Sequence, residues 1–370
     1  MRQAALTRPT WAELSRPALS SNLRLLRGLA GKASRVLAVV KADAYGHGAV
    51  EAAKHLQRLG VDAFGVATLE EAVQLRRARV SGQILLLGAL EPKHVREAAQ
   101  ARVGLTAWSR PYLDDAQRRL KGKRLDIHLK VDTGMARLGF TPEEVPGLLA
   151  DFAEKRWSHL NLASAYTHMA SADEHRDPSS AGQIKEFLSL PWPKGLKLHA
   201  ANSAATARYP KARLGWVRSG LLLYGASDPW LNPALKRQRP VLSLHSSVVR
   251  VHRIAKGQGV SYGHTFKALR STDVATLCVG YADGVPRFLS NRGFVRVRGK
   301  FCRILGRVTM DLMMVDVTGV AGVKPGTQAS LLDAQEGPTS ARGWAALGST
   351  NAYEVLCGIS DRVPRRWAGA

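Results

Sequence analysis

The sequence predicts an α/β protein, with an N-terminal (β/α)8 TIM-like barrel followed by a C-terminal domain that is mainly β. Short apolar runs alternate with helical spacing as far as about residue 226, and β-type patterning follows from about Pro240. Strands that alternate with helices pair in parallel through right-handed crossovers, and eight such units close a barrel. We therefore expect residues 1–240 to form the barrel domain and residues 241–370 the β domain.

Eight short apolar runs are the expected barrel strands. Their length and β-branched content are typical of buried parallel strands. One of the helices between them opens with Thr68 and Glu71 at the spacing of a capping box. An open doubly wound sheet is the alternative, but no GxGxxG motif follows the first strand. The expected strands are Val36–Val40, Ala63–Ala67, Ile84–Leu87, Val103–Ala107, Leu125–Val131, Leu162–Thr167, Leu196–Ala200 and Val217–Tyr224.

The C-terminal part alternates apolar and polar residues and contains turn signals such as Gly299-Lys300. A short helix near residues 341–347 and a final segment over 353–363 complete it. Residues 11–14 read as a short strand that is able to pair with this second domain. The strands that we expect here are 241–244, 247–254, 274–279, 294–298, 301–308 and 312–317.

The chain is strongly basic, with a formal net charge of +25. Nucleic-acid binding is one interpretation of such a charge, and it predicts affinity with a steep salt dependence. The basic residues are scattered, however, and the densest runs, 118–124 and 236–239, contain no interleaved aromatic residues. We therefore expect a solvated basic surface that attracts anions, and no nucleic-acid partner.

The remaining composition is that of a globular protein of the cytoplasm. The three cysteines, Cys278, Cys302 and Cys357, are far apart and predict free thiols, and no metal-binding motif is present. The sequence contains no apolar run of membrane-spanning length, and no apolar segment follows the N-terminal arginine. We expect neither a membrane nor a metal among its partners.

Lys41 follows the first predicted strand directly, at the edge of an apolar core. Burial would lower the pKa of its amine and make it able to form an imine. A lysine that extends past the strand end to solvent is the alternative interpretation.

Chemically active side chains follow the later barrel strands as well, and these strand ends are where barrels place their chemistry. Ser203 and the Gly220-Leu221 backbone follow the seventh and eighth strands, where such barrels hold a phosphate. An amine able to form an imine beside a phosphate seat predicts a site for pyridoxal 5′-phosphate (PLP). The residues that we expect at this mouth are Lys41, Tyr45, Lys130, Asp132, Arg137, His168, Asp173, His199, Asn202, Ser203, Arg218, Gly220 and Leu221.

The motifs around these residues resemble those of the alanine racemase family, fold-type III PLP enzymes, over nearly the whole chain. The matching stretches are Val39–Gly48, Lys130–Gly139, Thr167–Met169, His199–Ala204, Arg218–Gly225, Val260–Gly263, Gly280–Gly284, Gly306–Asp311 and Tyr353–Cys357. The resemblance implies a PLP-dependent racemase (EC 5.1.1.1) that interconverts L- and D-alanine, for peptidoglycan or for catabolism. It also implies a head-to-tail homodimer with shared active sites.

The resemblance assigns two bases to the reaction: Lys41, which also binds PLP covalently, and Tyr262, which the β domain supplies to the partner subunit. His168 and Arg218 would assist Tyr262, and Arg218, oriented by His199, would face the pyridine nitrogen. Arg137 and Met310 would bind the substrate carboxylate, and Lys130 matches a lysine that is carbamylated in some relatives. The other cofactor contacts implied are Tyr45, Arg137, Ser203, Gly220, Leu221 and Tyr353, and the corridor that leads substrate inward would include Asp173, Tyr281 and Arg307.

An arginine opposite the ring nitrogen keeps that nitrogen unprotonated, which should suppress transamination. Thr309 stands where several relatives carry cysteine, so inhibitor chemistry aimed at that thiol should not transfer.

Other functions remain as alternatives. A broad-specificity or serine racemase would share every residue named above. A fold-type III decarboxylase would place glutamate where this chain has Arg218, and a non-catalytic PLP-binding protein would lack residues 241–370 and Tyr262.

Overall fold

Eight parallel strands form the barrel sheet in the computed structural model, which describes residues 7–369. They pair in the order β8-β7-β6-β5-β4-β3-β2-β9, which confirms the predicted fold class. At the seam between the two end strands, the Arg218 N–H donates to Ala201 O at 2.9 Å. The strands are β2 (Arg35–Val39), β3 (Ala63–Val66), β4 (Gln83–Leu86), β5 (Val103–Ala107), β6 (Leu125–Lys130), β7 (Leu160–Tyr166), β8 (Lys197–His199) and β9 (Trp216–Ser219).

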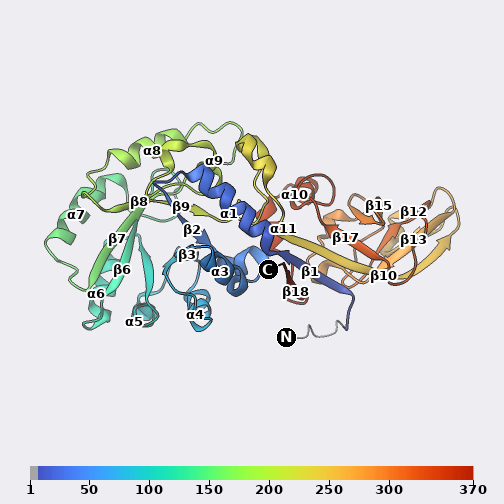
Figure 1. The fold of residues 1–370 in the computed structure, drawn as a ribbon, viewed down its shortest axis with the longest axis horizontal. Coiled ribbons are helices and arrows are strands. Elements are labelled where there is room, and N and C mark those ends of the chain that lie inside the picture. Colours follow the sequence, from blue (N-terminus) through green and yellow to red (C-terminus); the bar gives the residue numbers. More distant parts are fainter. Residues whose placement is uncertain (1–6, 370) are drawn as a thin grey trace. The chain divides into compact units, whose positions relative to one another are not determined.

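Helices occupy the gaps between these strands and lie outside the sheet (Figure 1). The predicted capping box is present: Thr68 Oγ1 accepts from the Glu71 N–H at 3.3 Å, and Glu71 Oε2 accepts from the Thr68 N–H at 3.3 Å. The helices are α1 (Arg16–Ala30), α2 (Lys41–Gly46), α3 (Ala49–Arg58), α4 (Leu69–Arg77), α5 (Val95–Gln100), α6 (Arg110–Leu120), α7 (Val145–Ala153), α8 (Ser180–Ser189) and α9 (Ser203–Arg208).

The last barrel strand is shorter than the apolar run that predicts it. It ends at Ser219, and the Leu223 N–H then donates to Gly220 O at 2.8 Å, which closes a turn. The apolar residues after Ser219 are buried in this turn rather than in a strand.

The chain divides into two compact units. The barrel unit comprises Ser20–Leu223 and Ser227–Arg237, and the second unit comprises residues 7–19, Tyr224–Ala226 and 238–369. The N-terminal strand β1 (Thr10–Ser15) belongs to the second unit, where it pairs with β10 (Leu242–Ile254) and β18 (Arg365–Ala368).

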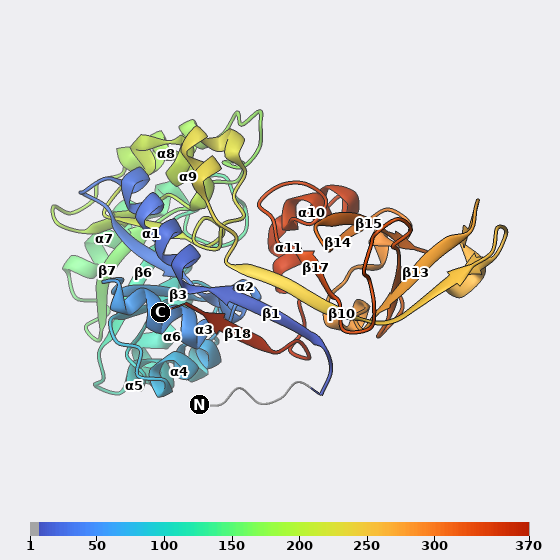
Figure 2. The ribbon, with the colours of Figure 1, turned by 45° about the vertical axis from the view of Figure 1, so that its right-hand side comes forward.

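The second unit is a mainly antiparallel β domain built on the long strand β10, which lies beside β1 (Figure 2). Strand β10 pairs with β17 through its first half and with β13 through its second half, and each pairing contains a register shift. Because β13 is also the end strand of the order that runs through β16, β15 and β14, these pairings close the sheet. The other elements are β11 (Gly259–Val260), β12 (Phe266–Lys267), β13 (Thr272–Leu277), β14 (Phe294–Val297), β15 (Lys300–Leu305), β16 (Met313–Asp316), β17 (Gln328–Leu332), α10 (Ala341–Gly348) and α11 (Ala352–Cys357).

A buried carboxylate anchors the N-terminal segment of this unit. Asp283 is fully buried, and Arg8 forms an ion pair with it that includes an Nη2–Oδ2 hydrogen bond of 2.8 Å. Asp283 Oδ2 also accepts from the Gly280 N–H at 2.9 Å, which fixes the turn that carries Tyr281. Arg8 and the Gly280 N–H therefore both bind the Asp283 carboxylate, which stabilises the loop around Tyr281.

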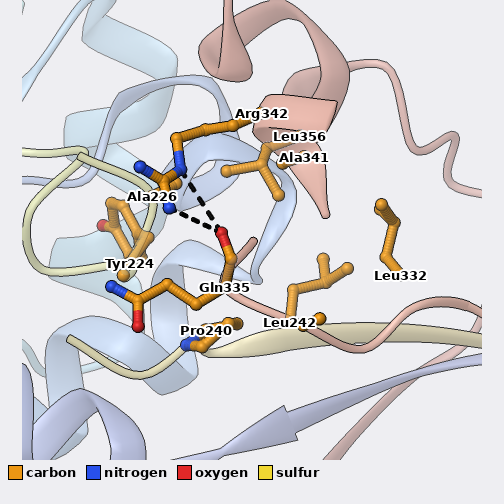
Figure 3. A pocket seen from close by; sticks show the side chains of 11 residues that line it. Tyr224, Ala226, Pro240, Leu242, Leu332, Gln335, Ala341, Arg342 and Leu356 are labelled. Atoms are coloured by element: carbon orange, nitrogen blue, oxygen red, sulfur yellow. Dashed lines mark hydrogen bonds between the residues drawn. The ribbon is translucent and has the colours of Figure 1, made fainter. Parts of the chain in front are cut away.

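A small cavity of about 20 Å³ lies where residues 224–226 pass the start of β10. Arg342 closes one side of it by donating to Gln335 O at 2.8 Å (Figure 3). Its lining contains none of the predicted site residues. Among residues 7–369, no helix combines the length and the apolar character needed to cross a membrane.

Candidate active site at the barrel strand ends

Lys41 lies just beyond β2, at the start of a turn with unusual backbone geometry. The four residues after it all have positive φ, from 50° at Ala42 to 55° at Tyr45. Left-handed geometry costs an L-residue roughly 1–2 kcal/mol. None of these four residues is glycine, so tertiary contacts must hold the turn in place.

Side chains from outside and inside the turn supply those contacts. Glu71 of α4 accepts the Ala42 N–H through Oε1 at 2.7 Å and the Ala67 N–H through Oε2 at 2.7 Å. Asp43 Oδ1 accepts the Ala49 N–H at 2.7 Å. Strained backbone of this kind persists where the surroundings over-determine it, and such places are concentrated at functional sites.

Tyr45, within the same turn, packs on the backbone after β9. A Cβ atom at Gly220 would clash with the Tyr45 ring and hydroxyl, so no side chain fits at position 220. Nearby, Ser203 Oγ accepts the Gly220 N–H at 3.1 Å and the Leu222 N–H at 3.4 Å. The structure thus brings together Tyr45, Ser203 and the Gly220 backbone, which we predicted as the phosphate seat.

Arg218 is the most heavily hydrogen-bonded residue of the predicted set. Its side chain is 4% exposed, and Nη2 donates to the carbonyl oxygens of Thr167 at 2.7 Å and Ala200 at 3.0 Å. Nη1 donates to His199 O and lies 3.0 Å from His199 Nδ1. Burial lowers the pKa of Arg218 to about 10, so the guanidinium stays charged at neutral pH.

His168, directly after β7, lies among four cationic side chains. Burial and then the charges of Arg218, Arg137, Lys130 and Lys41 hold its pKa well below the ordinary value. Arg218 Nη2 lies 3.2 Å from His168 Nδ1. His168 is therefore neutral at neutral pH, and the mouth of the barrel carries an excess of positive charge.

Lys130, at the end of β6, is buried with 4% exposure. Desolvation and the charge of Arg218 lower its pKa to about 8. The nearby carboxylate of Asp132 is engaged with backbone N–H groups of the following loop, with Oδ1 2.8 Å from Met135 N and Oδ2 3.0 Å from Arg137 N. Asp132 thus shapes the loop that carries Arg137, which is itself exposed.

The remaining predicted barrel residues take different positions. His199 ends β8, is fully buried, and stacks on Tyr166 with ring centroids 4.8 Å apart. Asn202 caps α9 by accepting the Ala205 N–H at 2.8 Å, and Asp173 is exposed in the loop after β7.

Tyr262, Tyr281, Arg307, Met310 and Tyr353 all belong to the second unit. The Tyr262 side chain is 73% exposed, although Ser261 Oγ anchors its turn by donating to Arg307 O at 2.7 Å. Tyr281 and Met310 lie in neighbouring loops, joined by a hydrogen bond of 3.1 Å from the Ala282 N–H to Met310 O. Tyr353 lies in α11.

Several residues of the barrel site were not predicted from the sequence. Tyr166 lies beneath Arg218, whose Cζ is 5.0 Å from the ring centroid. Ser164 and His128 form hydrogen bonds that continue from His199 into the barrel interior. A polar residue within an apolar strand was the one available signal for the last two, and it does not distinguish a site residue from a satisfied core residue.

A barrel mouth with a lysine in a strained turn, a cluster of Tyr45, Ser203 and the Gly220 backbone, and an arginine held by histidines is typical of a PLP-type amino-acid enzyme of barrel-plus-β architecture. The comparisons with known proteins agree. Residues 14–228 match the family "Alanine racemase, N-terminal domain", and residues 241–367 match "Alanine racemase, C-terminal domain". The chain belongs to the alanine racemase family, whose members depend on PLP, and its activity is the interconversion of L- and D-alanine.

Full-length relatives support this assignment. An alanine racemase of Desulforamulus reducens is 38% identical over 98% of this chain and 99% of its own length, and one of Symbiobacterium thermophilum is 40% identical over 98% of both. The crystal structure of an alanine racemase from Streptomyces lavendulae matches with a TM-score of 0.92 and 36% identity, over 99% of this chain and 98% of that one.

The Lys41 turn can be tested through Glu71. Glu71→Gln replaces one of the two carboxylate oxygens with an NH2 group. The backbone N–H of Ala42 or of Ala67 then faces a donor instead of an acceptor. We expect the free energy of unfolding to fall by about 1–3 kcal/mol, and covalent loading of Lys41 with PLP to slow. Urea unfolding and the rate of colour development on adding PLP measure the two effects. Glu186→Gln, an exposed glutamate on α8, should change neither, and a Glu71→Gln protein equal to wild type would contradict this account.

The buried histidines predict acid sensitivity. Burial lowers the pKa of His128 to about 4 and holds the pKa values of His168 and His199 well below the ordinary value. At mildly acidic pH the unfolded chain therefore binds protons at these histidines that the folded barrel does not bind. Stability should therefore fall as the pH drops below about 6.5, by about 1.4 kcal/mol per pH unit for each such histidine. Urea unfolding between pH about 6.5 and about 4.5 measures this slope. A flat profile in that window would show that these histidines are protonated in the folded protein.

Proposed function

We propose that racemisation in this protein uses two bases, Lys41 and Tyr262, with Tyr262 supplied by the partner subunit of a homodimer. PLP, when bound, supplies the electron sink that makes the substrate Cα proton removable. Lys41 would exchange a proton with one face of the substrate and Tyr262 with the other, so that the substrate need not turn over. The observation that carries this proposal is that Lys41 is held in a strained turn at a strand end of the barrel, while Tyr262 is 73% exposed in the second unit.

The donor set of the barrel mouth fits PLP. Arg137 and Arg218, whose charges both act on His168, supply guanidinium donors for the cofactor and the substrate carboxylate, and Lys41 supplies the amine. Tyr45, Ser203, Gly220, Leu221 and Tyr353 would hold the phosphate, and the absence of a side chain at Gly220 lets the Tyr45 hydroxyl approach this backbone closely.

Arg218 would face the pyridine nitrogen, and His199 would orient it. A guanidinium has donors but no acceptor, so it leaves a partner nitrogen unprotonated. Arg137 and the Met310 backbone would bind the substrate carboxylate, and Asp173, Tyr281 and Arg307 would line the corridor that leads to the site. His168 would assist the tyrosine base through its contact with Arg218.

We also propose that Lys130 is carbamylated. An amine reacts with CO2 only in its neutral form, and the pKa of about 8 leaves a usable fraction of neutral amine near pH 7. The carbamate would place a negative charge between Arg218 and Arg137, whose charges both act on Lys130. That charge would orient Arg137 toward the substrate.

The dimer proposal rests on the exposed residues of the second unit. Tyr262, Tyr281, Met310 and Leu312 are all at least 40% exposed, and aromatic and methionine side chains of this kind are typical of interface cores. A role in peptidoglycan precursor supply or in D-alanine catabolism, action on serine as well as alanine, and a cytoplasmic location stay predictions.

A mixing experiment tests the shared active site. Lys41→Ala and Tyr262→Phe should each be inactive alone. After reversible dissociation and reassociation of an equal mixture, half of the dimers are hybrids with one intact site, so about a quarter of the wild-type activity should return. Each variant mixed with itself is the control, and incorporation of deuterium at Cα in D2O is the assay, run with L-alanine and L-serine to test substrate breadth. An inactive mixture would refute the shared site, and an active Tyr262→Phe protein would refute the tyrosine base.

Carbamylation has a direct readout. Protein exchanged into 13C-bicarbonate should show one carbamate carbon resonance that is absent from Lys130→Ala. We expect Lys130→Ala to raise the KM for alanine at least severalfold, because Arg137 loses its anionic neighbour. Lys123→Ala, which removes an amine near the start of β6, serves as the matched control. A wild-type spectrum without the resonance would disprove the modification.

A further inference from the structure

A line of hydrogen bonds continues from Arg218 into the interior of the barrel. Arg218 Nη1 lies 3.0 Å from His199 Nδ1, His199 Nε2 lies 2.9 Å from Ser164 Oγ, and Ser164 Oγ lies 2.6 Å from His128 Nδ1. All four side chains are at most 4% exposed. Ser164 and His128 pair across β7 and β6, a layer below the barrel mouth.

The guanidinium fixes the direction of the first two bonds in this line, and the third is assigned so that the serine hydrogen has an acceptor. The guanidinium of Arg218 only donates, so His199 Nδ1 accepts and the proton of the neutral ring is on Nε2. His199 Nε2 then donates to Ser164 Oγ, and the serine gives its own hydrogen to His128 Nδ1. Each residue thereby determines the hydrogen-bonding state of the next.

We propose that Ser164 and His128 are positioning residues for the racemase reaction, because they hold His199 in the tautomer that accepts from Arg218. This inference rests on the proposed function, in which Arg218 faces the pyridine nitrogen. In the other tautomer, an N–H at His199 Nδ1 would oppose the N–H of Arg218 across 3.0 Å. Two opposed donors repel each other, so the guanidinium would turn away from its position.

The far end of the line lies at a second feature, a cavity of about 580 Å³ at the N-terminal ends of β4 and β5. His128 lines this cavity together with Gln83, Gly104 and the exposed Arg102. A Cβ atom at Gly104 would clash with His128 Nε2, so the missing side chain at 104 makes room for the ring. The N–H of His128 Nε2 thus lies beside the cavity, while Nδ1 stays committed to Ser164.

Two charged neighbours, and Arg218 within the line, bear on the protonation of its histidines. The Asp126 carboxylate raises the pKa of His128 and the Lys197 ammonium lowers it, while burial dominates and keeps the ring neutral. For His199, burial and the charge of Arg218 act in the same direction. A second proton on either ring would remove an acceptor that the line requires.

The test compares Ser164→Ala with Ser164→Thr, which retains a hydroxyl. In the apoprotein, 15N NMR of labelled histidine reports the His199 tautomer without any cofactor. We expect the wild type and Ser164→Thr to carry the proton on Nε2, and Ser164→Ala to populate the Nδ1–H form. Thr272→Val removes a buried hydroxyl from β13 of the second unit, where it donates to Arg270 O at 2.9 Å, and should leave the His199 tautomer unchanged.

In the holoenzyme, the readout is the partition between racemisation and transamination. Transamination converts alanine to pyruvate and leaves its amino group on the cofactor. The amount of pyruvate formed per racemisation event therefore measures how often the enzyme transaminates instead of racemising. We expect this ratio to rise at least tenfold in Ser164→Ala, as for the loss of about 1.4 kcal/mol of discrimination, and to stay within about twofold of wild type in Ser164→Thr.

A second pair of variants covers the case in which Ser164→Ala does not fold. His128→Asn keeps an acceptor in the place of Nδ1, so we expect the His199 proton to stay on Nε2. His128→Leu removes that acceptor, so we expect the Nδ1–H form of His199 and a raised pyruvate ratio. An unchanged His199 tautomer in Ser164→Ala or His128→Leu overturns the proposal, as does a changed tautomer with an unchanged pyruvate ratio. Failure of the proposed function is distinct from both, because the wild-type protein itself would then lack bound PLP or racemase activity.

Discussion

The buried guanidinium of Arg218 is the interaction on which the barrel site depends. It lies at the seam between β8 and β9, where it donates to the carbonyl oxygens of Thr167, His199 and Ala200. A buried charge without such bonds would be prohibitively costly. Here the bonds keep the charge in place and also satisfy carbonyl groups at the ends of β7 and β8. One side chain therefore links the ends of β7 and β8 to β9 and also sets the electrostatics of the mouth.

The fixed charge of Arg218 sets the protonation of its neighbours. It lowers the pKa values of Lys130, His168 and His199 beyond the effect of burial alone, so the two histidines stay neutral and the lysine amine becomes easier to deprotonate. A mouth arranged this way favours anionic ligands and disfavours additional protons. The charge of Arg218 thus adds to the positive potential of the mouth and also keeps the neighbouring histidines neutral.

Local sequence signals predicted the barrel well, because each parallel strand is a separate apolar run and each following loop carries its own polar residues. They failed where tertiary contacts overrule local preference. The left-handed turn after Lys41 contains Ala42 and Ala44, which have no preference for that geometry, and depends on Glu71 from another helix. Strands β17 and β18 were missed because short segments such as Arg365–Ala368 lack an apolar pattern and pair only within the assembled sheet.

The two groups of site residues have opposite relations to solvent. In the barrel unit, Arg218, His199, Ser203 and Lys130 are buried and locked by hydrogen bonds. In the second unit, the Tyr262 backbone is anchored by Ser261, yet its side chain is largely exposed. On the proposed two-base mechanism, Tyr262 would gain a neighbouring cation on assembly, because a nearby positive charge favours the phenolate that acts as the base. The barrel mouth of another subunit would supply that cation, so on this proposal catalysis is a property of the dimer.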